Sequence, residues 1–550
     1  MRRTMRWFSV LVVVVTVAAS PALGADDALV EAGRRIYAEG TLPGGEPLVA
    51  TRPEGLRLEG RFAACGTCHR PSGMGSIEGL TEQAILVPPL AGPVLFAPAR
   101  YANSFLDDSH HYIPNETWRR AMTRPGYDEA SLDVALRDGI NTAGIPLEAP
   151  MPLYDLDPDS LAALSAYLRE LGSEPDPGNE ADVLHVATIV TPDVDPADAA
   201  ATLGVLRVWA GSAYSAGKPW RLQEWRLSGP AESWLQQLET LYEEQPIFAV
   251  LSGIGRAQWA PVQDFCEIRR VPCVLPSVDA VPAAGGHYSV HYSAGVLLEA
   301  RILARHLESK SLSPGRIVHL YSSPSGRLAV EEFERRWQGS DPESLAVPYH
   351  VTVPTAAIRN LKPDDTLVLW LDEDEIRQLV VHAPETLASD VYISALLATP
   401  EDVELPAAWH GVTKFVTLFD DLGLQGEIAR LRLERWLEQK GLNASANRRL
   451  QADAYAAAYL FNAAIAEMKR EEVRRPAVPL TRAHLLEELE ERLSKYDDGN
   501  QFIDTESHVA WYGRMSLGPG QRIAVRGGSI VRYESPDSNR LVRVGERIVP

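Results

Sequence analysis

Short apolar runs alternate with helical periodicity over the larger, C-terminal part of the chain. The runs that predict buried strands are residues 183–190, 247–251, 272–275, 317–321, 366–371 and 391–396. The stretches that predict helices are residues 196–216, 258–269, 293–307, 424–439 and 450–469. Such alternation is typical of parallel sheets with crossover helices. It predicts an α/β architecture for this region.

The N-terminal part has a different pattern, with few strand signals. Its last predicted helix has one apolar face, formed by Leu161, Leu164, Leu168 and Leu171. Residues 172–180 follow and are polar, with Pro and Gly that cannot continue a helix. We therefore predict an all-α domain over residues 25–173, a linker over 174–181 and the α/β region over 182–550. With 550 residues, the chain is long enough for roughly three to five folding units.

The first 24 residues read as a secretory signal peptide. Arg2, Arg3 and Arg6 precede a short apolar run, and small residues at 22–24 offer a cleavage site. We expect export to the periplasm and no membrane span after cleavage; an uncleaved anchor is the alternative. The formal net charge is −21, and it becomes about −24 when these arginines leave with the signal. This acidity disfavours nucleic acid and anionic lipid as partners. It suits basic partner proteins, or simple solubility.

The chain has four cysteines, in two local pairs. Cys266 and Cys273 lie at the end of a predicted helix and the start of the next strand, and they are candidates for a disulfide in an oxidising compartment. Two buried thiols on facing elements are the alternative. Cys65 and Cys68 belong to the run Cys65-Gly66-Thr67-Cys68-His69.

The spacing of this run indicates covalent attachment of one haem c. Two thiols add to the vinyl groups of the porphyrin, and the histidine that follows becomes the proximal iron ligand. A redox dithiol would follow a strand, and none is predicted before Cys65. A zinc site would need a second pair close by. We therefore predict Cys65, Cys68 and His69 as the haem-binding residues.

The sixth iron ligand is expected to be Met151. The alternatives in this domain are Met74, which is close to His69 in sequence, Met122 in an apparent helix, and His110 and His111 in a predicted loop. Met151-Pro152, the later Tyr167-Leu168 and the first helix with Gly33 resemble class I cytochromes c. In that family the first and last helices cross, and a small residue such as Gly33 lets them approach closely. The interval from His69 to Met151 is longer than in compact members, so this insertion either folds over the haem edge or forms a docking surface.

The second region resembles type 1 periplasmic solute-binding proteins of the branched-chain amino acid class. The residues that carry this resemblance are 248–253, 261–262, 271–276, 317–321, 453–457, 518–522 and 530–533. It implies two α/β lobes with a ligand cleft between them and closure by hinge motion. The predicted fold is thus an all-α cytochrome c domain followed by a two-lobed periplasmic-binding-protein-like fold.

In that family the cleft is lined by loops at the carboxyl ends of strands. The matching positions here are Ser252, Gly253, Ser277, Tyr321, Ser322 and Asp372. The loop then continues through Arg256 to Trp259, which departs from the family's pattern and puts amino-acid specificity in doubt. Arg256 is a candidate anchor for an acid and Trp259 a candidate stacking residue; a surface role is the alternative for both. The run at 252–255 lacks the remaining glycine of a dinucleotide fingerprint and reads as a strand-end loop.

Two functions follow, and neither is that of a stand-alone enzyme. The first is an electron carrier between a periplasmic dehydrogenase and a respiratory acceptor, with the second region recognising a ligand or partner. The second is a receptor for a small organic or amino acid, of the kind that serves ABC transporters, whose haem domain senses redox state. A haem peroxidase is a third idea, which requires an open iron site.

Overall fold

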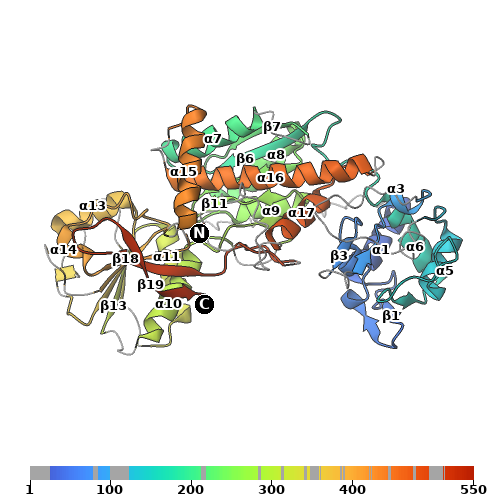
Figure 1. Ribbon diagram of the computed structural model, residues 1–550, viewed down its shortest axis with the longest axis horizontal. Coiled ribbons are helices and arrows are strands. Elements are labelled where there is room, and N and C mark those ends of the chain that lie inside the picture. The colour runs from blue at the N-terminus through green and yellow to red at the C-terminus, as the bar shows by residue number, and fades with distance from the viewer. Residues whose placement is uncertain are drawn as a thin grey trace, which may run out of the picture. The chain divides into compact units, whose positions relative to one another are not determined.

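The computed structural model divides the chain into two compact units, Met1–Ser173 and Glu174–Pro550 (Figure 1). It describes residues 25–78, 85–99, 123–211, 218–282, 286–310, 315–339, 343–346, 358–359, 361–384, 387, 390–419, 422, 424–443, 447–474, 478–494, 512, 515–518 and 520–550. The expected signal peptide and the candidates His110, His111 and Met122 lie outside these residues. In the described part, no helix has the length and apolarity needed to cross a membrane.

The first unit is built around two crossing helices. Its helices are α1 (Ala25–Glu39), α2 (Gly66–His69), α3 (Gly92–Leu95), α5 (Glu129–Asp138) and α6 (Pro158–Glu170), with a 3-10 turn at Gly60–Phe62. Helix α1 packs on α6, and their apolar faces share one core that includes Ile36, Tyr37 and Leu164. Asp157 caps α6, because its side chain accepts a hydrogen bond from the amide of Ser160 at 2.9 Å.

The expectation of an all-α first unit is not met in full. Strands β1 (Val49–Thr51), β2 (Arg57–Glu59) and β5 (Leu153–Tyr154) form one small antiparallel sheet, and β3 (Ser76–Glu78) pairs with β4 (Ile85–Val87) in another. These strands have two or three residues each. Runs so short show no measurable alternation of apolar and polar positions, so the hydrophobic pattern did not reveal them.

The second unit begins with a lobe built on a parallel sheet. The strand order is β11-β9-β6-β8-β10-β12, and β7 pairs with β6. The strands are β6 (Leu184–Val190), β7 (Trp220–Arg226), β8 (Ala249–Leu251), β9 (Ile254–Gly255), β10 (Cys273–Val274), β11 (Ser277–Val278) and β12 (Ser289–Val290). Since Ile254–Gly255 pairs with β11, the run at 252–255 is not only a loop, as the sequence had suggested.

Helices cover both faces of this first lobe. They are α7 (Pro196–Ala210), α8 (Trp234–Glu244), α9 (Ala260–Arg269), α15 (Leu424–Gln439), α16 (Arg448–Arg474) and α17 (Arg482–Ser494). Along β6, Leu184 and Val186 pack into one core, whereas Ala187 and Ile189 pack into the core formed with α8 and α9. Burial on both faces explains why β6 reads as a continuous apolar run. The long α16 lies beside α7 (Figure 1).

The second lobe has a sheet in the order β14-β13-β15-β16-β17-β18-β19. Its strands are β13 (Ile317–Tyr321), β14 (Glu343–Ala346), β15 (Thr366–Trp370), β16 (Asp390–Ser394), β17 (Thr413–Thr417), β18 (Gly528–Tyr533) and β19 (Leu541–Ile548). Its helices are α10 (Val296–Ser309), α11 (Pro324–Arg336), α13 (Glu373–His382) and α14 (Ala407–His410). The first five strands are parallel, and β18 and β19 add antiparallel pairs. The chain enters this lobe after β12 and leaves it after β17 for helices α15, α16 and α17 of the first lobe. It enters the second lobe again before β18.

Candidate functional site

The Cys-x-x-Cys-His run forms the short helix α2. Cys65 and His69 are buried, whereas Cys68 is exposed. Gly66 packs closely on α1, since a Cβ there would lie 3.2 Å from the ring of Tyr37. Tyr37 is fully buried, and its hydroxyl donates a hydrogen bond to the carbonyl of Arg70 at 2.6 Å. Helix α1 thereby holds the motif at both ends.

The ring of His69 is held in one orientation by a backbone carbonyl. Its Nδ1 lies 2.8 Å from the oxygen of Pro88, and a carbonyl can only accept, so the proton is on Nδ1. Burial lowers the pKa of His69 to about 4, although the bond to Pro88 opposes this shift. The imidazole is therefore neutral at pH 7. Histidines that bind metals have this arrangement, with one nitrogen donating to a carbonyl and the other left for the metal.

Tyr154 joins the segment of Met151 to the motif. Its hydroxyl donates to the carbonyl of Ala63 at 2.9 Å and also interacts with the thiol of Cys65. Burial raises the pKa of that thiol to about 12. Met151 is half-buried against the core cluster that contains Cys65. Two thiols, an oriented neutral imidazole and a thioether in one unit fit the donor set of a covalently attached haem.

The helix crossing expected at Gly33 is present. A Cβ on Gly33 would lie 2.0 Å from the carbonyl oxygen of Ala163 and 2.7 Å from the Cβ of Tyr167. The rings of Tyr37 and Tyr167 contact each other beside this crossing, with centroids 5.4 Å apart.

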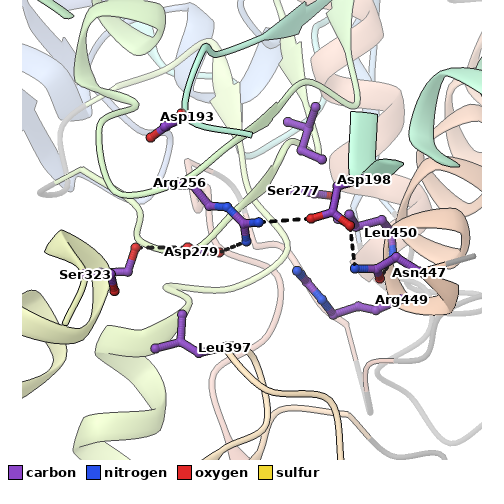
Figure 2. Close-up of polar contacts among 12 residues, drawn as sticks. Asp193, Asp198, Arg256, Ser277, Asp279, Ser323, Leu397, Asn447, Arg449 and Leu450 are labelled. Carbon is purple, nitrogen blue, oxygen red and sulfur yellow. Dashed lines mark hydrogen bonds and ion pairs between the residues drawn. The ribbon is translucent and has the colours of Figure 1, made fainter. Parts of the chain in front are cut away.

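In the second unit, Arg256 lies at the carboxyl edge of the first lobe's sheet, directly after β9. Figure 2 shows it between two carboxylates. Its Nη2 lies 3.0 Å from Asp198 Oδ2, and its Nη1 lies 3.6 Å from Asp279 Oδ1. Asn447 donates to the other oxygen of Asp198 at 3.0 Å. Asp279 is buried, whereas the Arg256 side chain as a whole is 35% exposed.

A second charged group lies beside Arg256, on α16. Asp453 accepts a hydrogen bond from Ser277 Oγ at 2.9 Å, and Arg449 lies 3.7 Å from the same oxygen. Burial raises the pKa of Asp453 to about 6, although Arg449 opposes the shift. The structure thus brings the predicted residues Arg256 and Ser277 to one polar network.

The second lobe reaches this network through α11. Ser325 donates a hydrogen bond to Asp279 Oδ2 at 2.9 Å, which joins the two lobes at their facing edges. Tyr321 is half-buried at the end of β13, and Ser322 follows it. These positions agree with the rule that ligands of open α/β sheets bind outside the carboxyl ends of strands.

Other predicted cleft residues have structural roles. Ser252 and Gly253 are buried, and a Cβ on Gly253 would lie 2.5 Å from the Trp259 ring. Trp259 itself is fully buried in the first lobe's core, so the expectation of a stacking or surface role is wrong. Asp372 caps α13: its carboxylate accepts from the Glu375 amide at 2.8 Å, and Glu375 accepts from the Asp372 amide at 3.0 Å.

The partners of Arg256 could not be predicted from the sequence. Asp198, Asp279 and Asn447 belong to no motif, and Asp453 drew attention only as part of a resemblance. Their contacts span long intervals in sequence, 58 residues for Arg256 with Asp198 and 176 for Ser277 with Asp453. Sequence patterns of short period carry no information on such pairs.

The second cysteine pair is brought together by α9 and β10. Cys266 and Cys273 are free thiols, both fully buried, and they hydrogen-bond to each other. Burial raises the pKa of Cys266 well above its usual range. The two side chains thus contact each other across α9 and β10, and the disulfide stays a prediction.

Comparison with known proteins informs the second unit. No protein-family model matches the chain, and no curated protein matches it. A fatty acid ABC transporter substrate-binding protein from Thermomonospora curvata is similar in structure, with a TM-score of 0.51, 12% identity, and 69% of this chain and 95% of that chain covered. A possible leucine/isoleucine/valine-binding protein from Rhodopirellula baltica SH 1 has a TM-score of 0.48 and 14% identity, over 66% and 97% of the two chains. The first likeness confirms the two-lobed fold expected for the second region.

Proposed function

We propose that the chain is a periplasmic receptor for a small organic or amino acid, with a haem c domain at its N-terminal end. The observation that carries the receptor function is the Arg256 network, which lies where strand ends of the two lobes face each other. The likeness in fold to a substrate-binding protein supports this function.

The chemistry of the network favours a ligand that carries a carboxylate. Arg256 is half-exposed and offers paired N–H donors, which match a carboxylate in a bidentate geometry. Asp198 and Asp279 compensate its charge while the cleft is empty, and they offer acceptors to an ammonium group. An amino acid would satisfy both kinds of partner.

A thermal-shift screen of amino acids and short organic acids, followed by calorimetry, tests this proposal. We expect Arg256→Gln to weaken binding of the best compound at least tenfold, because a bidentate charged contact is lost. Arg327→Gln is the matched control, since Arg327 is exposed on α11 and pairs only with Glu331 among the described residues. A screen without any binder, or equal affinity in Arg256→Gln, would refute the receptor function.

We further propose that Cys65 and Cys68 hold one haem c through thioethers, with His69 and Met151 as axial ligands. Such a haem supplies one-electron transfer, because a thioether occupies the sixth position. The hydrogen bond from His69 to Pro88 supports this assignment, since it fixes the tautomer that a ligand requires. Mass spectrometry of the peptide that contains Cys65, together with a haemochrome spectrum, tests the covalent attachment. A peptide without the added mass of haem would refute it.

The position of Met151 in the haem unit's core favours a second candidate, an electron carrier between a periplasmic dehydrogenase and a respiratory acceptor. It requires the reduced protein to pass electrons to an oxidised cytochrome or oxidase. Met151→Ala should remove the spectral signature of Met ligation. If that signature is absent from the native protein, Met151 is not an iron ligand and the electron carrier loses this support; an open iron site would then favour the peroxidase role.

A further inference from the structure

A cavity of about 970 Å³ lies in the second unit, and its lining residues do not include Arg256 or the partners Asp198, Asp279 and Asn447. It is lined by residues of both lobes, including Gln263 of α9 and Leu298 of α10. Pockets for small molecules in proteins measure about 300–1,000 Å³. The cavity is therefore large enough for an organic molecule of moderate size.

Arginines dominate the charge of this cavity. Five of them line it, against two acidic groups among its lining residues, Glu308 and the C-terminal carboxylate of Pro550; the arginines are Arg301, Arg305, Arg336, Arg522 and Arg526. Arg301 and Arg336 share a single carboxylate, that of the fully buried Glu332, which Arg335 also contacts. Arg522 pairs with Glu490. The shared Glu332 leaves this wall with more positive than negative charge.

Two of the lining arginines have no carboxylate partner within the part of the chain that the structure describes. Arg526 contacts the neutral side chain of Gln521, and Arg305 is exposed on α10 without an ion pair there. Guanidinium groups recognise carboxylates and phosphates in a planar, bidentate geometry. The cavity thus presents unneutralised donors to an anion.

A buried histidine provides an independent indication of a ligand. His291 also lines the cavity, is only 2% exposed, and has no hydrogen-bond partner at either ring nitrogen in the described structure. Buried polar groups are nearly always partnered, so such a ring calls for a missing donor or acceptor. Its backbone is tied to the returning segment, because its amide donates to the Arg522 carbonyl at 2.8 Å.

The remaining wall is apolar, with Val281, Leu298, Ile523 and Val525 among the lining residues. An inorganic anion would leave this surface in contact with water. A molecule with an apolar body would cover it and gain about 25 cal/mol for each Å² buried. We infer that this cavity is a second ligand site, which takes an organic anion with a carboxylate head and an apolar chain.

Calorimetric titration of the full-length protein with octanoate tests the inference. We expect octanoate to bind the native protein and the double variant Arg305→Gln/Arg526→Gln to bind it at least tenfold more weakly. Arg327→Gln, an arginine outside the lining, should keep native affinity. If octanoate also binds at the proposed receptor cleft, that second binding event should be lost in Arg256→Gln and kept in the double variant, which separates the two sites. Thermal denaturation establishes that each variant is folded.

Three outcomes would overturn the inference. One is the absence of octanoate binding, and another is octanoate binding that the double variant leaves unchanged. The third is stronger binding of inorganic phosphate or 1-octanol than of octanoate, since the first lacks the apolar chain and the second lacks the charge. His291→Leu is a further check: it should weaken octanoate binding without lowering the melting temperature, because an unpartnered buried ring is lost.

Discussion

Gly33 makes the crossing of α1 and α6 possible, because a hydrogen in place of Cβ leaves room for the carbonyl of Ala163. In an isolated helix, Gly→Ala would add about 1 kcal/mol of stability. Here the added methyl would lie 2.0 Å from a backbone oxygen. We expect Gly33→Ala to destabilise the first unit by about 1–3 kcal/mol, the usual range for overpacking. Denaturant unfolding followed by a probe in this unit measures the effect.

The matched control for this substitution is Gly411→Ala. A Cβ on Gly411 meets no atom within 4 Å, and its φ of −68° suits alanine. Its stability should change little. A gain of stability in Gly33→Ala would mean that the helices do not meet as closely as the structure shows.

Glu299 is a fully buried acid whose carboxyl contacts Ser394 Oγ at 2.5 Å and the Leu396 amide at 3.1 Å. Burial raises its pKa to about 8, although these bonds and Arg449 oppose the shift. The unfolded chain releases this proton near pH 4.5. Between the two values the folded state binds more protons, so the free energy of unfolding falls as pH rises, by up to about 1.4 kcal/mol per pH unit.

Glu299→Gln should remove this dependence, because an amide keeps both hydrogen bonds but does not ionise. We expect the free energy of unfolding of the variant to equal that of the native protein near pH 4.5 and to exceed it by a few kcal/mol near pH 8. Urea unfolding at several pH values between 4.5 and 9 gives the comparison. If the free energy of unfolding changed equally with pH in both proteins, the raised pKa of Glu299 would be contradicted.

Residue identities were predictable only where the chemistry is local in sequence. Cys65, Cys68 and His69 stand in one run, and Gly33 lies in a recognisable helix. The partners of Arg256 come from α7, from the residue after β11 and from the residue before α16, and only the fold brings them together. Trp259 shows the opposite error, since a residue beside a predicted cleft loop turned inward to fill the core against Gly253.

At the scale of elements, α13 gives Asp372 a structural role in addition to its predicted place in the cleft. A loop at the carboxyl end of a strand is also the start of the next helix, and Asp372 serves that helix. We expect Asp372→Ala to lower stability by about 1 kcal/mol, the usual effect of losing an N-cap. Asp372→Asn should stay close to native, since Asn caps well. Both variants should bind the best compound of the screen with native affinity. Weaker binding would show that Asp372 contributes to the ligand site.

Elements buried on both faces were the most predictable. The run at 317–321 coincides with β13, whose positions are nearly all buried. The helical periodicity over 424–439 coincides with α15, which buries one face through Ala429, Leu433 and Leu437. Strand β7 was missed, because Trp220 and Trp225 are its buried residues and charged side chains separate them. Strands β18 and β19 belong to the antiparallel end of a sheet, where polar positions interrupt the apolar run.

At the scale of the whole molecule, the polar linker with its prolines and glycines predicted two parts of different architecture. The fold of the second part followed from alternating strands and helices, because burial on both sides of a parallel sheet leaves a strong apolar signal. No such pattern in the sequence predicts whether the two parts act together. A haem and a solute cleft in one chain imply coupling only if each changes the equilibrium of the other.

The redox-sensing receptor predicts such coupling. Typical allosteric coupling changes affinity by about fivefold or more. Linkage then requires the bound solute to move the haem potential by about 40 mV, since a tenfold change corresponds to about 59 mV for one electron. Spectroelectrochemical titration with and without the best compound of the screen measures this shift. Arg256→Gln is the control, because it should lose the shift while its haem is intact. An unchanged potential in the native protein at saturating solute would mean that the two units act independently, and the haem would then serve electron transfer alone.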